Sequence, residues 1–500
     1  MLKVNDLKYF EKYTDKETFD KLKPYQTILE VLKTQKKNVG DILALSYKDI
    51  NLTYKQLYKH CCAITPYLTN LKKGSHIAIL SNNDLNFIVT SLGIMANGMV
   101  AVLIPNSLNS NEISDLLKKY DVEMLFYGNE FESIINELTY NNLTLINISS
   151  IDFLKTKYFY RKVNTTDVAS IVFSRKSDGS LRGAMLTHKS MLTSAFYGTL
   201  GIKNILRQRY YSILPFTHVF GFVRNILTPL VSESSIYICS NMRRMFKEIP
   251  TVKPQIMVLV PAILEMILNV SKKFNMDLFK NELHTVIVGG AAMPEYLIFE
   301  YNKLGVDIFQ GYGMTETSNL VTGNPSPLTK SASVGLIFPY QEVKIIDNEL
   351  YIKGPNQMVG YYNDEEENKK MMVDGFIKTG DLGYQDEDGY LYLQGRCDDL
   401  IILTNGENVS PVKIENLVNN IDIVASSMVY NDNDTLAIDV FLRKELISSK
   451  NLANPLEYVK ENIAKINQSL ASFERVNKIN IVENDFPKDE NMKLIRKRKG

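Results

Sequence analysis

The stretch "HIAILSNNDLNFIVTSLGIMANGMVAVLIP", residues 76–105, decides the fold class of this chain. Residues 76–80 form a short apolar run typical of a buried strand, and the apolar residues of 86–98 recur with helical spacing. Residues 99–105 are a second apolar run rich in β-branched side chains. A strand, a helix and a strand in this order predict a βαβ unit with two parallel strands.

Similar strand-like runs recur along the first 290 residues, at 123–128, 167–174, 211–215, 235–240, 256–261 and 284–290. Helix-like segments such as 262–274 lie between several of them. This alternation predicts a large α/β domain of mainly parallel sheets packed with helices. In such a domain, ligands bind beyond the carboxyl ends of the strands.

The pattern changes after about residue 330, where closely spaced strands and turns predict a β-rich subdomain with a hairpin at Asp388-Gly389. From Asp398 onward the chain has its own α+β pattern, with a strand-like run at 435–442 and a helix-like segment at 455–470. We therefore predict an N-terminal domain over 1–397 and a small C-terminal domain over 398–500.

Composition and charge narrow the class of protein. The chain has 500 residues, of which 45% are hydrophobic, and its 57 Lys and Arg against 56 Asp and Glu argue against nucleic acid or an anionic membrane as main partner. Its four cysteines lack metal-ligand spacing, which predicts core thiols in a reducing compartment. Without a signal-like N-terminus or an apolar run near 18 residues, the expected location is cytoplasmic, with no integral membrane segment.

Two polar clusters could bind a nucleotide. "FQGYGMTETS" (309–318) ends a predicted strand with two glycines, a hydroxyl at Thr315 and a carboxylate at Glu316, which could hold a divalent cation. In residues 375–399, Asp381 follows a Thr-Gly turn and offers a carboxylate to ribose hydroxyls, whereas Arg396 offers a guanidinium to phosphate.

Two further clusters lie toward the C-terminus. "NGENVSPVKIE" (405–415) is a glycine-containing loop that leads into a helix capped around Ser410-Pro411, and the basic tail contains Lys493. Each cluster, taken singly, also has a structural interpretation: a Gly-rich turn is usually only a turn, His218 in "LPFTHVFG" a core histidine and Lys493 a solvated lysine.

The order of the motifs resembles the adenylate-forming superfamily, which contains acyl- and aryl-CoA synthetases, adenylation domains of non-ribosomal peptide synthetases and luciferases. The resemblance extends from about Pro24 to Arg496 and is greatest to AMP-forming fatty acyl-CoA ligases. The matching motifs are "LTYKQL" (52–57), "LPFTHVFG" (214–221), "VGGAAMP" (288–294), "QGYGMTET" (310–317), "GPNQMVGYY" (354–362), "KTGDLG" (378–383), "GRCDDLI" (395–401), "GENVSP" (406–411) and "PKDENMKLIR" (487–496).

The resemblance implies that a carboxylic acid attacks the α-phosphate of Mg-ATP, which yields an acyl-adenylate and pyrophosphate, and that the acyl group then passes to a thiol. Because two anions must meet, positive charge is needed at the reaction centre. By resemblance, Lys493 supplies it and is catalytic together with His218. Glu316 would hold Mg²⁺.

The remaining roles implied by the resemblance concern binding and movement. Asp398 would be the hinge about which the small domain rotates, bringing Gly406 to the face where the thioester forms. The other implied residues are Ser174, Ser177, Gly179, Arg182 and Thr315 for phosphates, Gly290, Ala291, Gly311, Tyr312, Asp381 and Arg396 for adenine and ribose, and Phe216, Val219 and Phe222 for the acyl pocket.

The phosphate loop "SRKSDGSLRG" (174–183) departs from the family's hydroxyl- and glycine-rich pattern. Arg175, Lys176, Asp178 and Leu181 replace a hydroxyl residue, a glycine, a threonine and a proline, and a carboxylate near phosphate is unfavourable unless the basic pair offsets it. Three interpretations follow: a working loop of altered chemistry, a slow enzyme, or a relative kept for binding. Near the other end of the chain, Met492 stands where the family has a glycine before the catalytic lysine.

In the superfamily that this chain resembles, amino-acid-activating members have an Asp near this motif to bind the substrate ammonium, and aryl-acid members commonly have an Asn after the His. This chain has Phe216 and Thr217 before His218 and Val219 and Phe220 after it, which favours an uncharged carboxylic acid, and the apolar neighbours suit an acyl tail. We therefore expect activation of a medium- or long-chain fatty acid with ATP and Mg²⁺, followed by transfer to CoA. Loading of the phosphopantetheine of an acyl carrier protein is an alternative. A catalytically impaired acyl- or nucleotide-binding protein is another.

Overall fold

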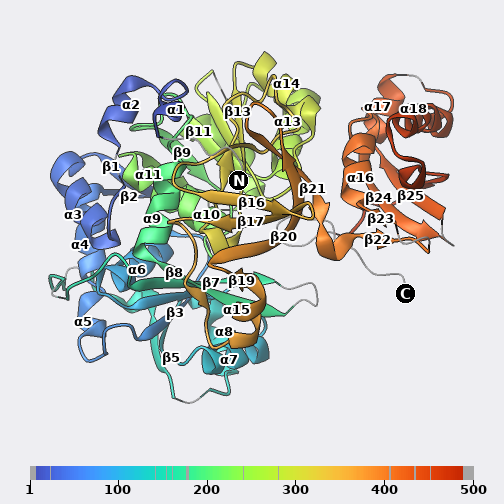
Figure 1. The fold of residues 1–500 in the computed structure, drawn as a ribbon. Helices are drawn as coiled ribbons and strands as arrows, with labels where there is room; N and C mark the ends of the chain where they lie inside the picture. The colour runs from blue at the N-terminus through green and yellow to red at the C-terminus, as the bar shows by residue number, and fades with distance from the viewer. Residues whose placement is uncertain are drawn as a thin grey trace.

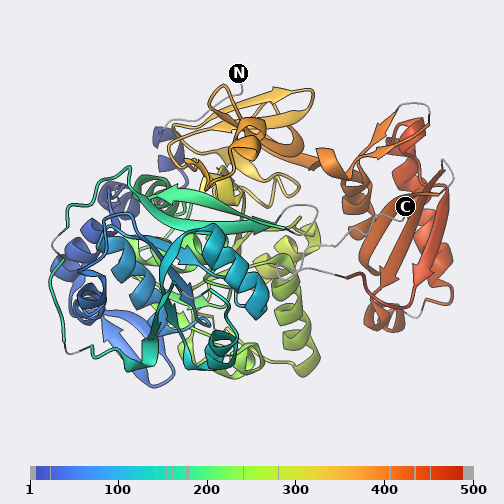
Figure 2. The same cartoon turned by 90° about the horizontal axis from the view of Figure 1, so that it is seen from below.

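The computed structural model describes residues 7–22, 24–140, 142–153, 155–159, 161–175, 180–239, 241–279, 281–404, 407–432, 435–450 and 452–487. Figure 1 shows a large body that contains the chain up to strand β21 and, beside it, a smaller C-terminal unit. The two units also stand apart when the molecule is seen from below (Figure 2).

The predicted βαβ unit is present as β3 (His76–Leu80), α6 (Leu85–Ala96) and β4 (Val100–Leu103). The side chain of Asp84 caps α6 by accepting a hydrogen bond from the backbone N–H of Phe87. Strands β3 and β4 are parallel, with His76 opposite Val100. The helix is buried nearly all round, so burial of its apolar side chains is the main source of its stability.

The unit belongs to a seven-stranded sheet in the order β18-β8-β7-β4-β3-β5-β6. Its other strands are β5 (Val122–Tyr127), β6 (Thr144–Asn147), β7 (Val168–Arg175), β8 (Leu181–Thr187) and β18 (Gly360–Tyr361). Strands β7 and β8 are antiparallel, with Ser174 opposite Arg182. The two ends of the predicted phosphate loop therefore lie side by side in a hairpin.

A fourteen-stranded sheet runs through the rest of the body. Its parallel part consists of β1 (Leu43–Tyr47), β9 (Arg209–Ser212), β10 (Ser235–Ile238), β11 (Ile256–Leu259), β12 (Thr285–Val288) and β13 (Asp307–Tyr312). From β13 onward the pairing is antiparallel, through β14 (Thr322–Gly323), β15 (Gly335–Ile337), β16 (Glu342–Ile346), β17 (Glu349–Lys353), β19 (Met372–Val373), β20 (Phe376–Gln385) and β21 (Tyr390–Arg396). The short β2 (Ile50–Thr53) pairs antiparallel with β1 at the opposite edge.

Helices cover both sheets (Figure 1). Those of the body are α1 (Leu7–Glu11), α2 (Lys16–Lys21), α3 (Ile28–Val39), α4 (Tyr54–Cys62), α5 (Thr65–Leu68), α7 (Ser110–Lys119), α8 (Glu132–Asn136), α9 (His188–Tyr197), α10 (Val219–Phe222), α11 (Thr228–Val231), α12 (Met245–Val252), α13 (Pro261–Phe274), α14 (Glu295–Lys303) and α15 (Glu365–Met371). A π-helical turn, η3 (Val223–Leu227), joins α10 to α11. No helix among the described residues is both long enough and apolar enough to cross a membrane.

The predicted hairpin at Asp388-Gly389 connects β20 to β21, and Gly389 has a φ of 89°, which a glycine adopts without strain. The expectation of core thiols is correct for three of the four cysteines. Cys397 is half-buried instead, because it lies in the short 3₁₀ turn η6 (Cys397–Asp399) that connects the two units.

The C-terminal unit has a hydrophobic core of its own, formed by residues between Leu403 and Val476. Its elements are β22 (Ile401–Ile402), β23 (Asn408–Val409), α16 (Pro411–Asn419), β24 (Val424–Asp432), β25 (Thr435–Leu442), α17 (Lys444–Ser449), α18 (Pro455–Ser469) and β26 (Lys478–Val482). As predicted, Ser410 caps α16, by accepting a hydrogen bond from the Lys413 N–H. The unit also contacts the body directly, since Arg443 pairs with Glu265 of α13 at 2.9 Å.

Candidate active site

Three predicted phosphate and metal ligands meet beside the β7–β8 hairpin. The hydroxyl of Ser174 donates a hydrogen bond to Oε1 of Glu316 (3.0 Å), and Nε of Arg182 donates to Ser174 Oγ (3.3 Å). Nη2 of Arg182 lies 3.8 Å from the same Glu316 oxygen. Ser174 and Arg182 face each other because directly opposed residues of an antiparallel pair project on the same side of the sheet.

Two further side chains complete this cluster and were missed by the sequence analysis. Tyr361 of β18 donates its hydroxyl to Glu316 Oε1 (2.6 Å), and its ring lies 4.8 Å from the Arg182 guanidinium carbon. Glu367 of α15 accepts a hydrogen bond from Arg182 Nη1 (2.5 Å). The motif "GPNQMVGYY" (354–362) contains Tyr361, but it indicates the family and not a role for this side chain. No sequence pattern could have identified Glu367, since its carboxylate contacts Arg182, which lies 185 residues earlier in the chain.

Glu316 is the buried centre of the cluster, with 2% of its surface exposed. Burial, and then the Glu316 carboxylate, raise the pKa of the Tyr361 phenol well above its usual range, so the phenol stays protonated and donates. No group of three or more metal-binding side chains occurs in the described ranges. One carboxylate with neighbouring hydroxyls fits Mg²⁺ that is shared with substrate phosphates, because such sites use one or two protein carboxylates.

A second cluster consists of Tyr312, Asp381 and Arg396, and Tyr312 lies four residues before Glu316. The hydroxyl of Tyr312 donates to Asp381 Oδ2 (2.6 Å), and Nη1 of Arg396 lies 2.9 Å from Asp381 Oδ1. Asp381 and Arg396 are direct partners in the β20–β21 ladder. Burial and the Asp381 carboxylate raise the pKa of Tyr312 well above its usual range. The clusters are linked because Tyr312 ends β13 and Glu316 lies in the 3₁₀ turn η5 (Thr315–Thr317) that follows, together with the half-buried Thr315.

The residues predicted for adenine lie at the carboxyl ends of two adjacent parallel strands. Gly290 and Ala291 follow β12 and are exposed, whereas Gly311 lies in β13, and Val288 pairs with Gln310 between these strands. A β-carbon on Gly311 would lie 2.8 Å from the carbonyl oxygen of Thr322, so only glycine fits there. The position agrees with the expectation that ligands bind beyond the strand ends.

The predicted acyl-pocket residues lie in the hydrophobic core that contains α6. Phe216 and Phe222 have no exposed surface and Val219 has 8%, and the ring of Phe216 lies 5.8 Å from that of Phe87. His218 precedes α10 and is half-buried. Asp398, the predicted hinge, is exposed in η6, where the chain passes between the two units.

Several predicted site residues lie outside the described residues: Ser177, Gly179, Gly406 and Lys493. The same holds for Lys176, Asp178 and Met492. The structure brings together Ser174, Arg182 and Glu316 in one cluster and Tyr312, Asp381 and Arg396 in the other.

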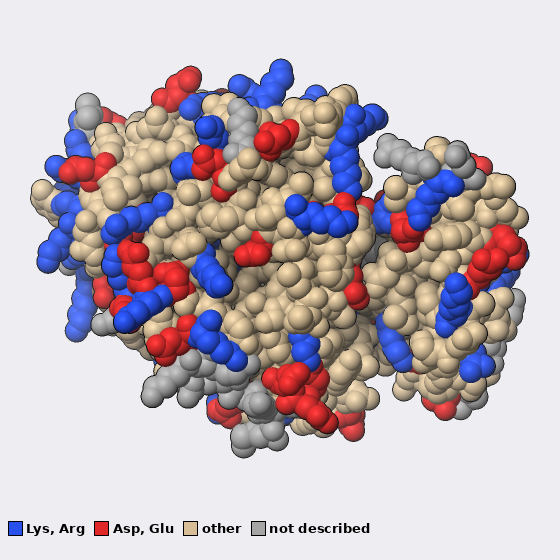
Figure 3. All heavy atoms as spheres, turned by 90° about the horizontal axis from the view of Figure 1, so that it is seen from above, with Lys and Arg blue, Asp and Glu red and all other residues tan. Residues whose placement is uncertain are grey.

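The charges on the surface bear on the kind of partner that the protein can bind. On the face shown in Figure 3, basic and acidic side chains alternate without a broad area of one sign, in agreement with a net charge of +1.

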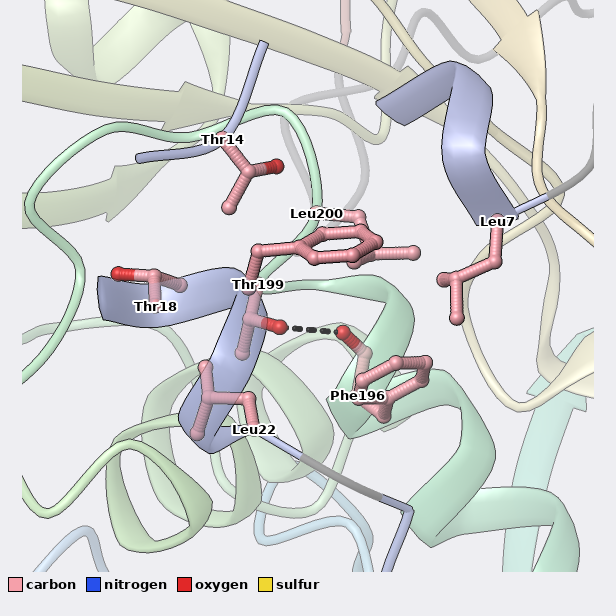
Figure 4. Close-up of a pocket in the computed structure, with 8 residues that line it drawn as sticks. Leu7, Thr14, Thr18, Leu22, Phe196, Thr199 and Leu200 are labelled. Atoms are coloured by element: carbon pink, nitrogen blue, oxygen red, sulfur yellow. Dashed lines mark hydrogen bonds between the residues drawn. The ribbon is translucent and has the colours of Figure 1, made fainter. Parts of the chain in front are cut away.

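A cavity of about 20 Å³ lies between the N-terminal helices and α9 (Figure 4). Its lining includes Leu7, Leu22 and Phe196 and none of the residues of the two clusters, so it is a packing gap of the core.

Comparisons with known proteins were made on the whole chain. The model of the AMP-binding enzyme family matches residues 32–362, and that of the AMP-binding enzyme C-terminal domain matches residues 398–499. A 2-succinylbenzoate–CoA ligase of Oceanobacillus iheyensis is 28% identical over 92% of this chain and 96% of that protein. A 4-coumarate–CoA ligase-like protein of Arabidopsis thaliana is 27% identical over 70% of this chain and 69% of that protein.

Solved structures share the fold. The o-succinylbenzoate CoA synthetase of Bacillus subtilis in complex with ATP and magnesium superposes with a TM-score of 0.77 at 22% identity, covering 93% of this chain and 98% of that chain. An anthranilate CoA ligase in complex with anthranoyl-AMP has a TM-score of 0.80 at 20% identity, covering 95% and 97%. The 2-succinylbenzoate and anthranilate named here are aromatic acids, so these relatives do not support the expected fatty acid.

Proposed function

This chain belongs to the AMP-binding enzyme family and is an ATP-dependent, AMP-forming acyl-CoA ligase, and we propose that its acid is an aromatic carboxylic acid of the 2-succinylbenzoate type. The observation that best supports ATP binding is that the Glu316 cluster and the Asp381 cluster are connected. One short segment, from Tyr312 to Glu316, joins a Tyr–Asp–Arg group to a buried carboxylate beside Ser174 and Arg182. These two environments suit the ribose and the phosphates of a nucleoside triphosphate.

We assign the binding roles from this geometry. Asp381, held by Tyr312 and Arg396, accepts hydrogen bonds from the ribose hydroxyls. Ser174 and Arg182 face the phosphates, with Thr315 at the start of η5. Glu316 holds Mg²⁺, which, when bound, neutralises phosphate charge.

Positive charge is needed where the acid carboxylate approaches the α-phosphate, because two anions repel each other. We assign this role to Lys493 of the C-terminal domain, 398–500, which is the second unit of the chain in our proposal. Asp398 is then the hinge, and Gly406 belongs to the face where the acyl-adenylate meets the thiol.

The acid and the acceptor are proposed from the relatives. The 2-succinylbenzoate–CoA ligase of Oceanobacillus iheyensis matches over 92% of this chain, and its name specifies an aromatic acid and CoA. None of the relatives named here is a carrier-protein ligase, so CoA is the acceptor that we propose.

Pyrophosphate exchange into ATP tests this proposal. The acids are 2-succinylbenzoate, 4-coumarate, anthranilate, decanoate and phenylalanine, and Lys493→Ala is compared with Lys465→Ala, an exposed lysine of the same unit. We expect exchange with 2-succinylbenzoate, its loss in Lys493→Ala only, and a CoA thioester by chromatography. Exchange with decanoate alone would overturn the aromatic substrate, and folded protein without any exchange would favour a binding protein.

A further inference from the structure

One asparagine connects the two sheets of the body beside the predicted His218 motif. Asn83 lies between β3 and α6, at the carboxyl end of a strand of the seven-stranded sheet. Its Nδ2 donates a hydrogen bond to the carbonyl oxygen of Leu214 (2.7 Å), and its Oδ1 accepts one from the backbone N–H of Phe216 (2.9 Å). These partners lie just beyond the carboxyl end of β9, which belongs to the fourteen-stranded sheet.

The backbone turn that Asn83 holds leads directly to His218. The N–H of His218 donates to the carbonyl oxygen of Pro215 (3.3 Å), and α10 begins at the next residue. A β-carbon on Gly221 of α10 would lie 1.9 Å from the same carbonyl oxygen, so glycine is required where α10 packs against the turn. The backbone of residues 214–216 therefore fixes the start of α10, and with it the position of His218.

The loop that carries Asn83 is itself held in place. Oδ1 of Asn82 accepts a hydrogen bond from Asn106, which follows β4, and the N–H of Asn82 donates to Glu130, which follows β5; both distances are 3.1 Å. On the other side, Asp84 caps α6. The loops after three adjacent parallel strands are thus linked, so the amide of Asn83 projects from a fixed base, as a residue that orients another must.

The helix that starts at this turn also reaches the nucleotide site. A β-carbon on Gly289 would lie 3.3 Å from the ring of Phe220 and 3.5 Å from the carbonyl oxygen of Gly311. Phe220 of α10 therefore packs against the ends of β12 and β13, where we expect adenine to bind. The distance between His218 and these strand ends depends on the turn, and the turn depends on the two hydrogen bonds of Asn83.

Resting on the proposed function, we propose that Asn83 is a positioning residue for the activation of the acid, because it holds His218 in place beside the nucleotide. A side-chain amide offers a donor and an acceptor side by side, which matches the carbonyl of Leu214 and the N–H of Phe216. Precise placement matters, since a shift of about 1 Å in a reacting group can lower a rate by about 100-fold.

The test is pyrophosphate exchange with the acid that the wild type exchanges fastest. Asn83→Ala removes both hydrogen bonds to the turn, and Asn82→Ala is the matched control, because it removes a hydrogen bond of the same loop and none to the turn. In Asn83→Ala we expect kcat/KM for the acid to fall by about 10- to 100-fold, whereas the KM for ATP stays within about twofold. Asn83→Asp keeps the acceptor and loses the donor, so its value should be intermediate.

A double-mutant cycle separates positioning from a merely structural role. Added to His218→Ala, Asn83→Ala should lower the exchange rate by less than about twofold, because the side chain to be positioned is gone. Calorimetric titration with AMP should give the wild-type affinity in every variant. Thermal unfolding verifies folding, and if Asn83→Ala does not fold, the same comparisons are made with Asn83→Asp.

Three results would overturn the inference: an unchanged kcat/KM in folded Asn83→Ala, an equal loss in Asn82→Ala, or a full further loss in the His218→Ala background. Weaker AMP binding in Asn83→Ala would overturn it too, since the disturbance is then general. A wild type that exchanges with no acid overturns the proposed function instead. The NMR signal of the His218 ring, assigned with His218→Ala, then decides the inference: it should shift in Asn83→Ala and not in Asn82→Ala, and an unchanged signal refutes it.

Discussion

Replacing Glu367 by glutamine tests how Arg182 is kept at its distance from Glu316. Arg182 lies between two carboxylates, 2.5 Å from Glu367 and 3.8 Å from Glu316, and all three side chains are at least four-fifths buried. Without the Glu367 charge, we expect the guanidinium to move onto Glu316 and to compete there with the Mg²⁺ that we propose Glu316 binds. The variant is therefore expected to bind Mg-ATP less tightly.

The size of the effect follows from the two distances. At an effective dielectric near 20, two unit charges attract by about 4.4 kcal/mol at the 3.8 Å observed between Arg182 and Glu316. At the ~2.8 Å of a charged hydrogen bond the attraction is about 5.9 kcal/mol. The difference of about 1.5 kcal/mol corresponds to roughly a tenfold rise in the KM for Mg-ATP.

The assay is pyrophosphate exchange at varied Mg-ATP with a saturating acid. Glu366→Gln is the matched control, since it removes the same charge one residue earlier, where the side chain is exposed. Excess Mg²⁺ should restore much of the activity of Glu367→Gln, because the ion displaces Arg182 from Glu316. If both variants have the same KM, or if Glu367→Gln binds Mg-ATP more tightly, Glu367 does not hold Arg182 away from Glu316, the metal ligand that we propose.

Three further predictions concern single residues. Asp381→Asn removes the charge that faces Arg396 at 2.9 Å, so we expect a higher KM for ATP and a loss of roughly 1–3 kcal/mol in stability; an ATP titration with normal KM would contradict the ribose role. Burial lowers the pKa of His188 to about 4, below the ~6.5 of the unfolded chain. The unfolded state therefore gains a proton first as pH falls from 6.5 toward 4, and about 3 kcal/mol of stability is lost over that window. Thermal unfolding between pH 7 and pH 4.5 should show a weaker pH dependence for His188→Gln, and an equal dependence would refute this assignment. A β-carbon on Gly183 would lie 2.5 Å from the ring of Tyr120, so Gly183→Ala should lower the melting temperature through roughly 1–3 kcal/mol of overpacking; an unchanged melting curve would show that the ring moves at no cost.

The resemblance drawn from the ordered motifs is confirmed by the family match, and the α/β body by the structure. The elements of residues 76–105 were predicted to within a few residues, because burial on both faces leaves an unbroken apolar run that local periodicity detects. The fatty acid was inferred from the same motifs and is not supported by the relatives. Apolar side chains such as Phe216 and Phe222 look alike in a core and in a pocket, so the sequence offered no means of separating the two.

By itself, the sequence determined the family, and it predicts the order of the domains and the site roles of Ser174, Arg182, Glu316, Tyr312 and Asp381, since these residues lie in motifs of recognisable local spacing. Only the tertiary structure decided which side chains face them. Glu367 reaches Arg182 across 185 residues, and Asn83 reaches the turn that precedes His218 across 131 residues. A charge acts through distance in space, and strand register and helix packing set that distance.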